Sequence, residues 1–210
     1  MANNKGGKEN ILEAARTVIA RHGVNSASVQ AIADEAGLSK GAVYYHYKGK
    51  DDILYEMIDQ FLRTVIAPVK YSLNSTGDYQ ELKKGILSGV SQRLSAMEQN
   101  RLQFYLTHEA LIGNEEMHDL LIRKYNGWVD TTERIMNRMY AIEPSKLNRA
   151  LAATMIAAVD GQVIQLLLEA KVVTIEELMD LWEVLMEVGV PKLLTYLLEV
   201  KGAAPTNNDV

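Results

Sequence analysis

The chain has 210 residues, of which 48% are hydrophobic, and it carries a formal net charge of −5 at pH 7. This apolar fraction suffices for a substantial core and excludes wholesale disorder. The chain contains no cysteine, which excludes a disulfide framework, a thiolate zinc site and a cysteine nucleophile.

The charge is distributed unevenly. Residues 1–50 hold seven Lys or Arg and four Asp or Glu, a balance of +3, so the rest of the chain carries −8. An acidic protein does not coat nucleic acid by bulk attraction, but a basic N-terminal segment permits a local contact with a polyanion. Random placement of charged residues on a protein surface can give an imbalance of the same size. The charge distribution therefore indicates nucleic-acid binding only together with a DNA-binding motif.

No segment has the pattern of a signal peptide or a membrane span. The first residues, MANNKGGKEN, lack an apolar core. The most apolar stretch, 150–168, is interrupted by Asp160, Gln162 and Gln165. We therefore expect a soluble cytoplasmic protein with no membrane partner.

Apolar residues recur at helical spacing almost throughout, as at Leu54, Met57, Ile58 and Phe61. This periodicity predicts an all-α fold, and no fixed repeat indicates a solenoid. The expected helices span residues 8–22, 28–36, 40–47, 50–73, 78–98, 100–112, 114–140, 144–171 and 175–188, followed by a turn-rich helix to about residue 200.

Local signals set these boundaries. Asp78 with Glu81, and Thr174 with Glu177, have the spacing of N-terminal capping boxes. Further helix starts are indicated by Asn114, which precedes two acids, and by Pro144, which suits a first helical turn. Helix ends or kinks are expected at Gly23, Pro68, Gly189 and Pro191.

Residues 28–47, SVQAIADEAGLSKGAVYYHY, have the features of a helix-turn-helix. Small or apolar side chains, including Ile32 and Ala33, allow two short helices to cross closely, and Gly37 permits the tight turn between them. Ser39 is expected to cap the second helix. A helix this short needs support from its neighbours, and it can present one face to a DNA major groove.

Several polar residues of this segment are suited to phosphates and base edges. Lys50 is informative because a lysine at a helix N-terminus opposes the helix dipole, which an external anion would explain; a solvated surface lysine is the alternative. The candidate DNA-binding residues are Ser28, Gln30, Ser39, Lys40, Gly41, Tyr44, Tyr45, His46 and Lys50.

The run from Ala27 to Leu54, with AIA at 31–33, AGLSKG at 36–41, VYYHY at 43–47 and KDDIL at 50–54, resembles the DNA-binding signature of the TetR family. The resemblance covers about a quarter of the chain. It implies that Tyr44 and Lys50 hold phosphates, that Lys40 and Tyr45 lie near base edges, and that Val43 and Tyr47 are core. Tyr47 departs from the pattern, since the family commonly has phenylalanine there.

The resemblance also implies a layout: a helix-turn-helix domain, expected over residues 1–49, and a larger helical ligand-binding and dimerisation domain, expected over 50–202. The polar end of the chain predicts a flexible tail over 203–210. The expected function is a ligand-responsive regulator, by family default a repressor, that binds palindromic operator DNA as a homodimer and is released by a small molecule.

Apolar residues beyond position 150 outnumber what one subunit readily buries, which favours a four-helix dimer interface over the alternative of a monomeric core. Within this region, Asp160 requires a partner or an interface because a lone buried charge is costly. The candidate interface residues are Met155, Asp160, Gln162, Leu166, Leu181, Trp182 and Leu185.

The middle helices mix aromatic walls with a few polar groups, as ligand pockets do, although such residues are more often plain core. The candidate ligand contacts are Met97, Phe104, Tyr105, His108, Tyr125 and Trp128. The effector itself is an unknown small molecule, and no cofactor or metal is expected.

Two other functions compete with this interpretation: a helical enzyme and a dimeric interaction module that does not bind DNA. The four histidines form no HExxH pattern, and no Gly-rich phosphate loop or G-x-S-x-G elbow is present. We therefore expect no catalytic residues. Salt dependence separates the remaining alternatives, because phosphate contacts release counterions.

Overall fold

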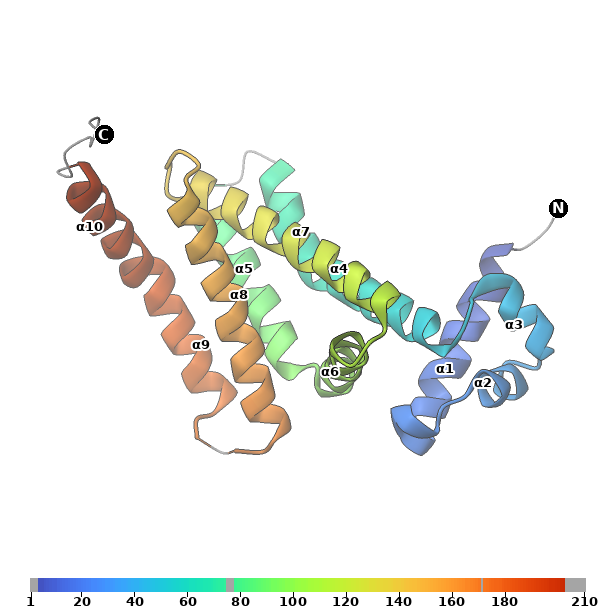
Figure 1. Ribbon diagram of the computed structural model, residues 1–210. Coiled ribbons are helices and arrows are strands. Elements are labelled where there is room, and N and C mark those ends of the chain that lie inside the picture. Colours follow the sequence, from blue (N-terminus) through green and yellow to red (C-terminus); the bar gives the residue numbers. More distant parts are fainter. Residues whose placement is uncertain (1–3, 75–77, 171, 203–210) are drawn as a thin grey trace. The chain divides into compact units, whose positions relative to one another are not determined.

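A computed structural model describes residues 4–74, 78–170 and 172–202. Within these ranges the chain forms ten α-helices and one π-helical turn, with no strand, which confirms the predicted all-α fold (Figure 1). The elements are α1 (Asn4–Ser26), α2 (Val29–Glu35), α3 (Lys40–His46), α4 (Lys50–Asn74), α5 (Tyr79–Ser95), α6 (Met97–Leu111), α7 (Glu115–Met139), α8 (Lys146–Leu167), α9 (Ile175–Val184), η1 (Leu185–Gly189) and α10 (Val190–Gly202).

The predicted capping signals start helices as expected. Ser39 accepts a hydrogen bond from the backbone N–H of Ala42 at the start of α3. Thr174 and Glu177 form a complete capping box at α9. Gly23 has a φ of 77° and interrupts the regular conformation of α1 where the helix was predicted to end.

Other boundaries differ from the predictions. The helix expected from Pro144 begins at Lys146, because Ser145 is extended and caps it. It ends at Leu167 rather than at 171, and Glu169 beyond it has a positive φ of 52°. Pro68 does not end α4, which continues to Asn74. The predicted tail, 203–210, lies outside the described residues.

The chain divides into two compact units. The first combines the residues up to Thr64 with Ala96–Trp128, and the second combines Val65–Ser95 with the residues from Val129 onwards. This division does not fall at residue 49, where the sequence placed its domain boundary.

Neighbouring residues of α4 explain why the first unit extends past the helix-turn-helix. Ile53 packs into the core formed by α1, α2 and α3, whereas Leu54 packs against α6 and α7. Met57 contacts both clusters. The start of α4 is therefore packed between the three N-terminal helices and α6.

The core of the second unit is built on residues of α5, α8, α9, η1, α10 and the end of α7. Trp182 and Met186 lie at the centre of one buried cluster, with Leu82 of α5 and Met139 of α7. The indole N–H of Trp182 donates to Gln162 of α8 at 2.9 Å, which links α8 to α9.

The expected break at Gly189 and Pro191 does not occur, because α9 continues into α10 through the π-helical turn η1. The N–H of Val190 donates to the carbonyl of Leu185, five residues back. Pro191 has no N–H to offer the carbonyl of Met186. That carbonyl instead accepts hydrogen bonds from the hydroxyls of Tyr79 and Tyr140, at 3.1 and 2.8 Å.

We expect the two tyrosines to act together in stabilising this turn. Burial raises the pKa of both hydroxyls, so they remain protonated donors. Tyr140→Phe should lower the free energy of unfolding by about 1 kcal/mol, because Tyr79 still serves the carbonyl. The double variant with Tyr79→Phe should lose about 3 kcal/mol, more than the sum of the single losses, since it leaves a buried acceptor without a partner. Urea unfolding at one protein concentration measures this; purely additive losses would contradict it.

Candidate nucleic-acid interface

The helix α3 is held in place by its buried side. Val43 is fully buried and Tyr47, its C-terminal cap, is 5% exposed. Gly37 in the turn before α3 has a φ of 66°, a conformation that favours glycine. The seven-residue helix is thus fixed by its caps, its turn and its core residues rather than by its own stability.

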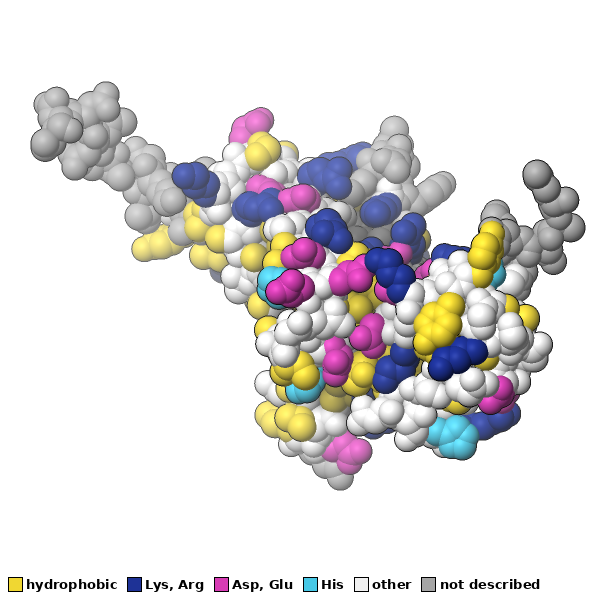
Figure 2. All heavy atoms as spheres, turned by 45° about the vertical axis from the view of Figure 1, so that its right-hand side comes forward, with side chains coloured by type: hydrophobic (Ala, Val, Ile, Leu, Met, Phe, Trp, Pro, Cys, Tyr) yellow, Lys and Arg dark blue, Asp and Glu magenta, His cyan; other side chains and the backbone are white. Residues whose placement is uncertain are grey.

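The opposite side of α3 is exposed, and we call Lys40, Gly41, Tyr44 and Tyr45 the α3 face. The side chains of Tyr44 and Tyr45 are 49% and 77% exposed. The ammonium of Lys40 lies 5.8 Å from the ring centroid of Tyr44. Figure 2, in which the N-terminal helices are turned forward, shows hydrophobic and basic side chains next to one another on this part of the molecule.

The remaining predicted DNA-binding residues of the helix-turn-helix have local partners. Ser28 caps α2 by accepting from the N–H of Ala31, so its side chain has a structural role. Gln30 is exposed and donates to Asp34 at 2.8 Å. His46 is half-buried, and its ring lies edge-on to Tyr45 with centroids 5.0 Å apart.

Lys50 has partners inside the protein that the sequence did not reveal. Its ammonium lies 3.4 Å from the carbonyl oxygen of Val24, near the end of α1, and 4.9 Å from the ring centroid of Tyr105 on α6. The sequence argument explained this lysine by an external anion. In the structure, a backbone carbonyl and an aromatic face already stabilise its charge.

The six predicted ligand contacts are not brought together at one described cavity. Tyr105 lines a cavity of about 430 Å³ beside the start of α4. His108 is exposed on α6, and its ring lies 3.8 Å from the carboxylate of Glu109. The rings of Tyr125 and Trp128 contact each other on α7, with centroids 4.7 Å apart. Met97 and Phe104 are half-buried on α6.

Most of the predicted interface residues lie against the subunit's own core. Trp182 is 3% exposed, and Met155 and Leu185 pack against the same cluster. Asp160 accepts from Arg93 of α5 at 3.1 Å. Gln162 accepts a hydrogen bond from Trp182. Gln162 and Leu166 both line a small cavity. Leu181, by contrast, is 50% exposed.

The structure also assembles polar residues that the sequence did not single out. Asn114 was recognised only as a helix start, but its side chain also reaches Asp51, 63 positions away. Lys48 pairs with Glu116 in the same region. No local spacing signals a contact across such a distance.

A family model and curated relatives match parts of the chain by sequence. The family model described as "Bacterial regulatory proteins, tetR family" matches residues 11–57. A curated relative, the probable acrEF/envCD operon repressor of Escherichia coli, is 26% identical over 60% of this chain and 59% of its own length. The chain therefore spans about three fifths of the length of this relative.

Solved structures share the fold over most of the chain. A putative transcriptional regulator of Saccharomonospora viridis, in complex with choline, has a TM-score of 0.69 at 21% identity, covering 88% of this chain and 97% of that one. The regulator FadR of Bacillus subtilis, in complex with stearoyl-CoA, has a TM-score of 0.65 at 19% identity, covering 86% and 98%.

The fold and the α3 face define an all-helical protein with an N-terminal helix-turn-helix. With the family-model match over residues 11–57 and these relatives, the N-terminal region of the chain is similar to the TetR family of bacterial regulatory proteins.

Proposed function

We propose that the protein is a transcriptional repressor that binds palindromic operator DNA as a homodimer and dissociates from it on binding a small molecule. The observation that carries this proposal is the α3 face. Tyr44 and Tyr45, which are 49% and 77% exposed beside a lysine on a rigidly held short helix, contribute little to folding. They are suited to a major groove, where the hydroxyls and the ammonium can contact phosphates and base edges.

An exposed apolar stripe in the second unit supports the homodimer. An 18-residue window of α8 has a mean hydropathy of 1.6, yet only 11% of it is buried. Length and composition alone would let α8 cross a membrane, which is weak evidence for a span. We define the stripe as the exposed residues Ile164, Leu168, Leu181, Val184 and Val188.

A second copy of the chain covers this stripe in our proposal. Leu181, Val184 and Val188 follow one another at spacings of three and four, so they lie on one side of α9 and η1. A two-fold dimer presents two recognition helices, which matches a palindromic operator. The regulator would act in the cytoplasm, where its DNA is, with a protein surface rather than lipid against α8.

The effector in this proposal is a small molecule of unidentified chemistry, with no cofactor and no catalytic step. Related structures are recorded with choline and with stearoyl-CoA, which are ligands of those proteins. α4 is one continuous helix whose residues belong to both compact units. It could therefore couple effector binding in one unit to DNA binding by the other. Effector and operator would then weaken each other's binding by the same factor.

Fluorescence anisotropy on fragments tiling the DNA that flanks the gene tests the proposal. We expect one fragment to bind tightly, with an affinity that falls steeply as salt rises. No selective binding to any fragment would favour the alternatives of an enzyme or an interaction module. An affinity for DNA that does not change with salt concentration would exclude the phosphate contacts.

Substitutions on the α3 face and at Lys50 of α4 should separate contacts that position the protein on DNA from contacts that read the base sequence. Tyr44→Phe and Lys50→Ala should weaken binding to all DNA sequences, each by about tenfold, and Lys50→Ala should reduce the salt slope by about one. Lys40→Ala should in addition relax the preference for the operator. Lys84→Ala, on an exposed lysine of α5 in the second unit, is the matched control. Equal loss of specificity in all three variants would contradict these roles.

A further inference from the structure

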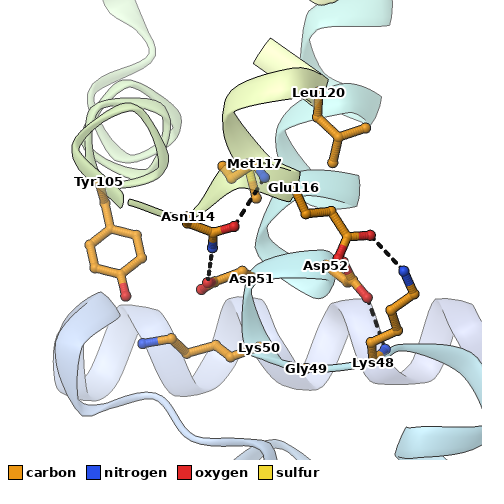
Figure 3. A pocket seen from close by; sticks show the side chains of 10 residues that line it. All are labelled: Lys48, Gly49, Lys50, Asp51, Asp52, Tyr105, Asn114, Glu116, Met117 and Leu120. Atoms are coloured by element: carbon orange, nitrogen blue, oxygen red, sulfur yellow. Dashed lines mark hydrogen bonds and ion pairs between the residues drawn. The ribbon is translucent and has the colours of Figure 1, made fainter. Parts of the chain in front are cut away.

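Asn114 lies where three helices of the first unit meet, and its polar groups bond to all three. Its backbone N–H donates to the carbonyl of Glu109 at 3.0 Å, which closes the end of α6 around Gly113, whose φ is 122°. Its side-chain oxygen accepts from the N–H of Met117 at 3.0 Å and caps α7. Its side-chain NH₂ donates to Asp51 of α4, also at 3.0 Å (Figure 3).

Residues at the start of α4 make further hydrogen bonds and an ion pair close to Asn114. The backbone N–H of Lys48 donates to the carboxylate of Asp52 at 2.8 Å. The ammonium of Lys48 pairs with Glu116 of α7 at 2.6 Å, but both side chains are more than half exposed, so this ion pair contributes little. We call Asn114, Asp51, Lys48, Asp52 and Glu116 the three-helix junction.

Packing fixes the first turn of α4 on one side, where Ile53 is buried in the core of α1, α2 and α3. Leu54 and Ile58 are buried against Leu102 and Leu106 of α6. The first turn also borders the cavity of about 430 Å³, between Tyr105 and the junction (Figure 3). On the side that borders the cavity, hydrogen bonds to Asp51 and Asp52 hold the first turn.

The surroundings of Asp51 strengthen its hydrogen bond with Asn114. Burial raises the pKa of the Asp51 carboxyl, while Lys50 and the hydrogen bond from Asn114 oppose that rise. A hydrogen bond to a partly desolvated carboxylate is charge-assisted and stronger than one between neutral groups. The ion pair between Lys48 and Glu116 is exposed to solvent, so water screens it and it is not strengthened by desolvation.

We infer that Asn114 is a positioning residue for DNA binding. It ties the first turn of α4 to the turn between α6 and α7, and so sets where Lys48 and Lys50 present their ammonium groups. The inference rests on the proposed function, because it names what those lysines contact. A displacement of α6 or α7 would reach both lysines through this side chain, beside the contacts of Tyr105 with Lys50 and of Glu116 with Lys48.

An exchange of the two partners tests the inference in the full-length chain. Asn114→Asp keeps the cap on α7, since Asp and Asn cap equally well, but it sets a second carboxylate against Asp51. Combining it with Asp51→Asn restores a hydrogen bond with donor and acceptor exchanged. Ser145→Ala is the matched control, because Ser145 caps α8 in the second unit.

Two measurements are made on each variant. Without DNA, hydrogen–deuterium exchange follows the peptide covering residues 46–54. With DNA, anisotropy follows binding to the flanking fragment that the unchanged protein selects. Asn114→Asp should speed exchange in this peptide and weaken DNA binding about tenfold with a shallower salt slope, and the double variant should recover to within about threefold. Ser145→Ala should change neither.

The outcomes separate this inference from the proposed function. If the unchanged protein selects no fragment, the proposed function fails, and the exchange measurement alone still decides whether Asn114 positions α4. If the unchanged protein binds but Asn114→Asp binds equally well, or if the double variant gives no rescue, Asn114 has only a structural role and the inference is overturned.

Discussion

Leu181→Asp is expected to convert the proposed homodimer to monomers. Leu181 is 50% exposed in the isolated subunit and belongs to the stripe with Val184 and Val188. In a dimer that buries this stripe, each new carboxylate is desolvated without gaining an ion-pair partner, which opposes association. The two-fold symmetry places one such carboxylate on each subunit, so the unfavourable free energy is counted twice. A combined penalty of about 4 kcal/mol raises the dimer dissociation constant about a thousandfold. Operator affinity should fall with it, because a monomer reaches only one half-site.

Sedimentation velocity over a range of concentrations measures this change. Leu111→Asp is the matched control, because Leu111 is 76% exposed but lies on α6 in the first unit, outside the stripe. That variant should remain dimeric. Monomers from Leu111→Asp together with dimers from Leu181→Asp would place the interface elsewhere. Since Leu181 is already exposed, the fold of the subunit should be retained.

Asp160→Ala is expected to lower the free energy of unfolding by about 3 kcal/mol. Arg93 of α5 donates to Asp160 of α8 at 3.1 Å, and the two side chains are only 8% and 18% exposed. The guanidinium stays charged at any accessible pH, so it remains buried with one ion pair fewer. Asp160→Asn keeps an acceptor in place and should lose about half as much.

Urea unfolding of the full chain checks this prediction. Glu13→Ala provides the comparison, because the pair between Arg16 and Glu13 is exposed and should contribute less than about 0.5 kcal/mol. Equal losses from Asp160→Ala and Glu13→Ala would show that burial gives the Arg93 pair no added weight.

Short-range patterns predicted much of the fold and of the α3 face. Ser39 and Thr174 start helices because a capping oxygen needs only the backbone N–H groups two or three residues ahead. Val43 and Tyr47 are buried, and Tyr44 and Tyr45 are exposed, as helical periodicity and the family signature together indicated. Each of these features depends on residues within one or two turns of each other.

Register within apolar helices was harder to predict. The expected interface on α9 and η1 combined Leu181 with Trp182 and Leu185, but only Leu181 of these three is on the exposed side. A helix that is apolar nearly all round gives no sequence contrast between the side facing its own core and the side facing a second subunit. Burial in the folded chain supplies that contrast.

The sequence by itself determined the helical class, most helix starts and the helix-turn-helix, because caps, turns and amphipathic periods are local. Only the tertiary structure decided the partners of single polar groups: Arg93 for Asp160, Asp51 for Asn114, Val24 for Lys50, and the two tyrosines for the Met186 carbonyl. These pairs join helices distant in sequence, and their energies depend on burial and distance, which exist only once the helices have packed.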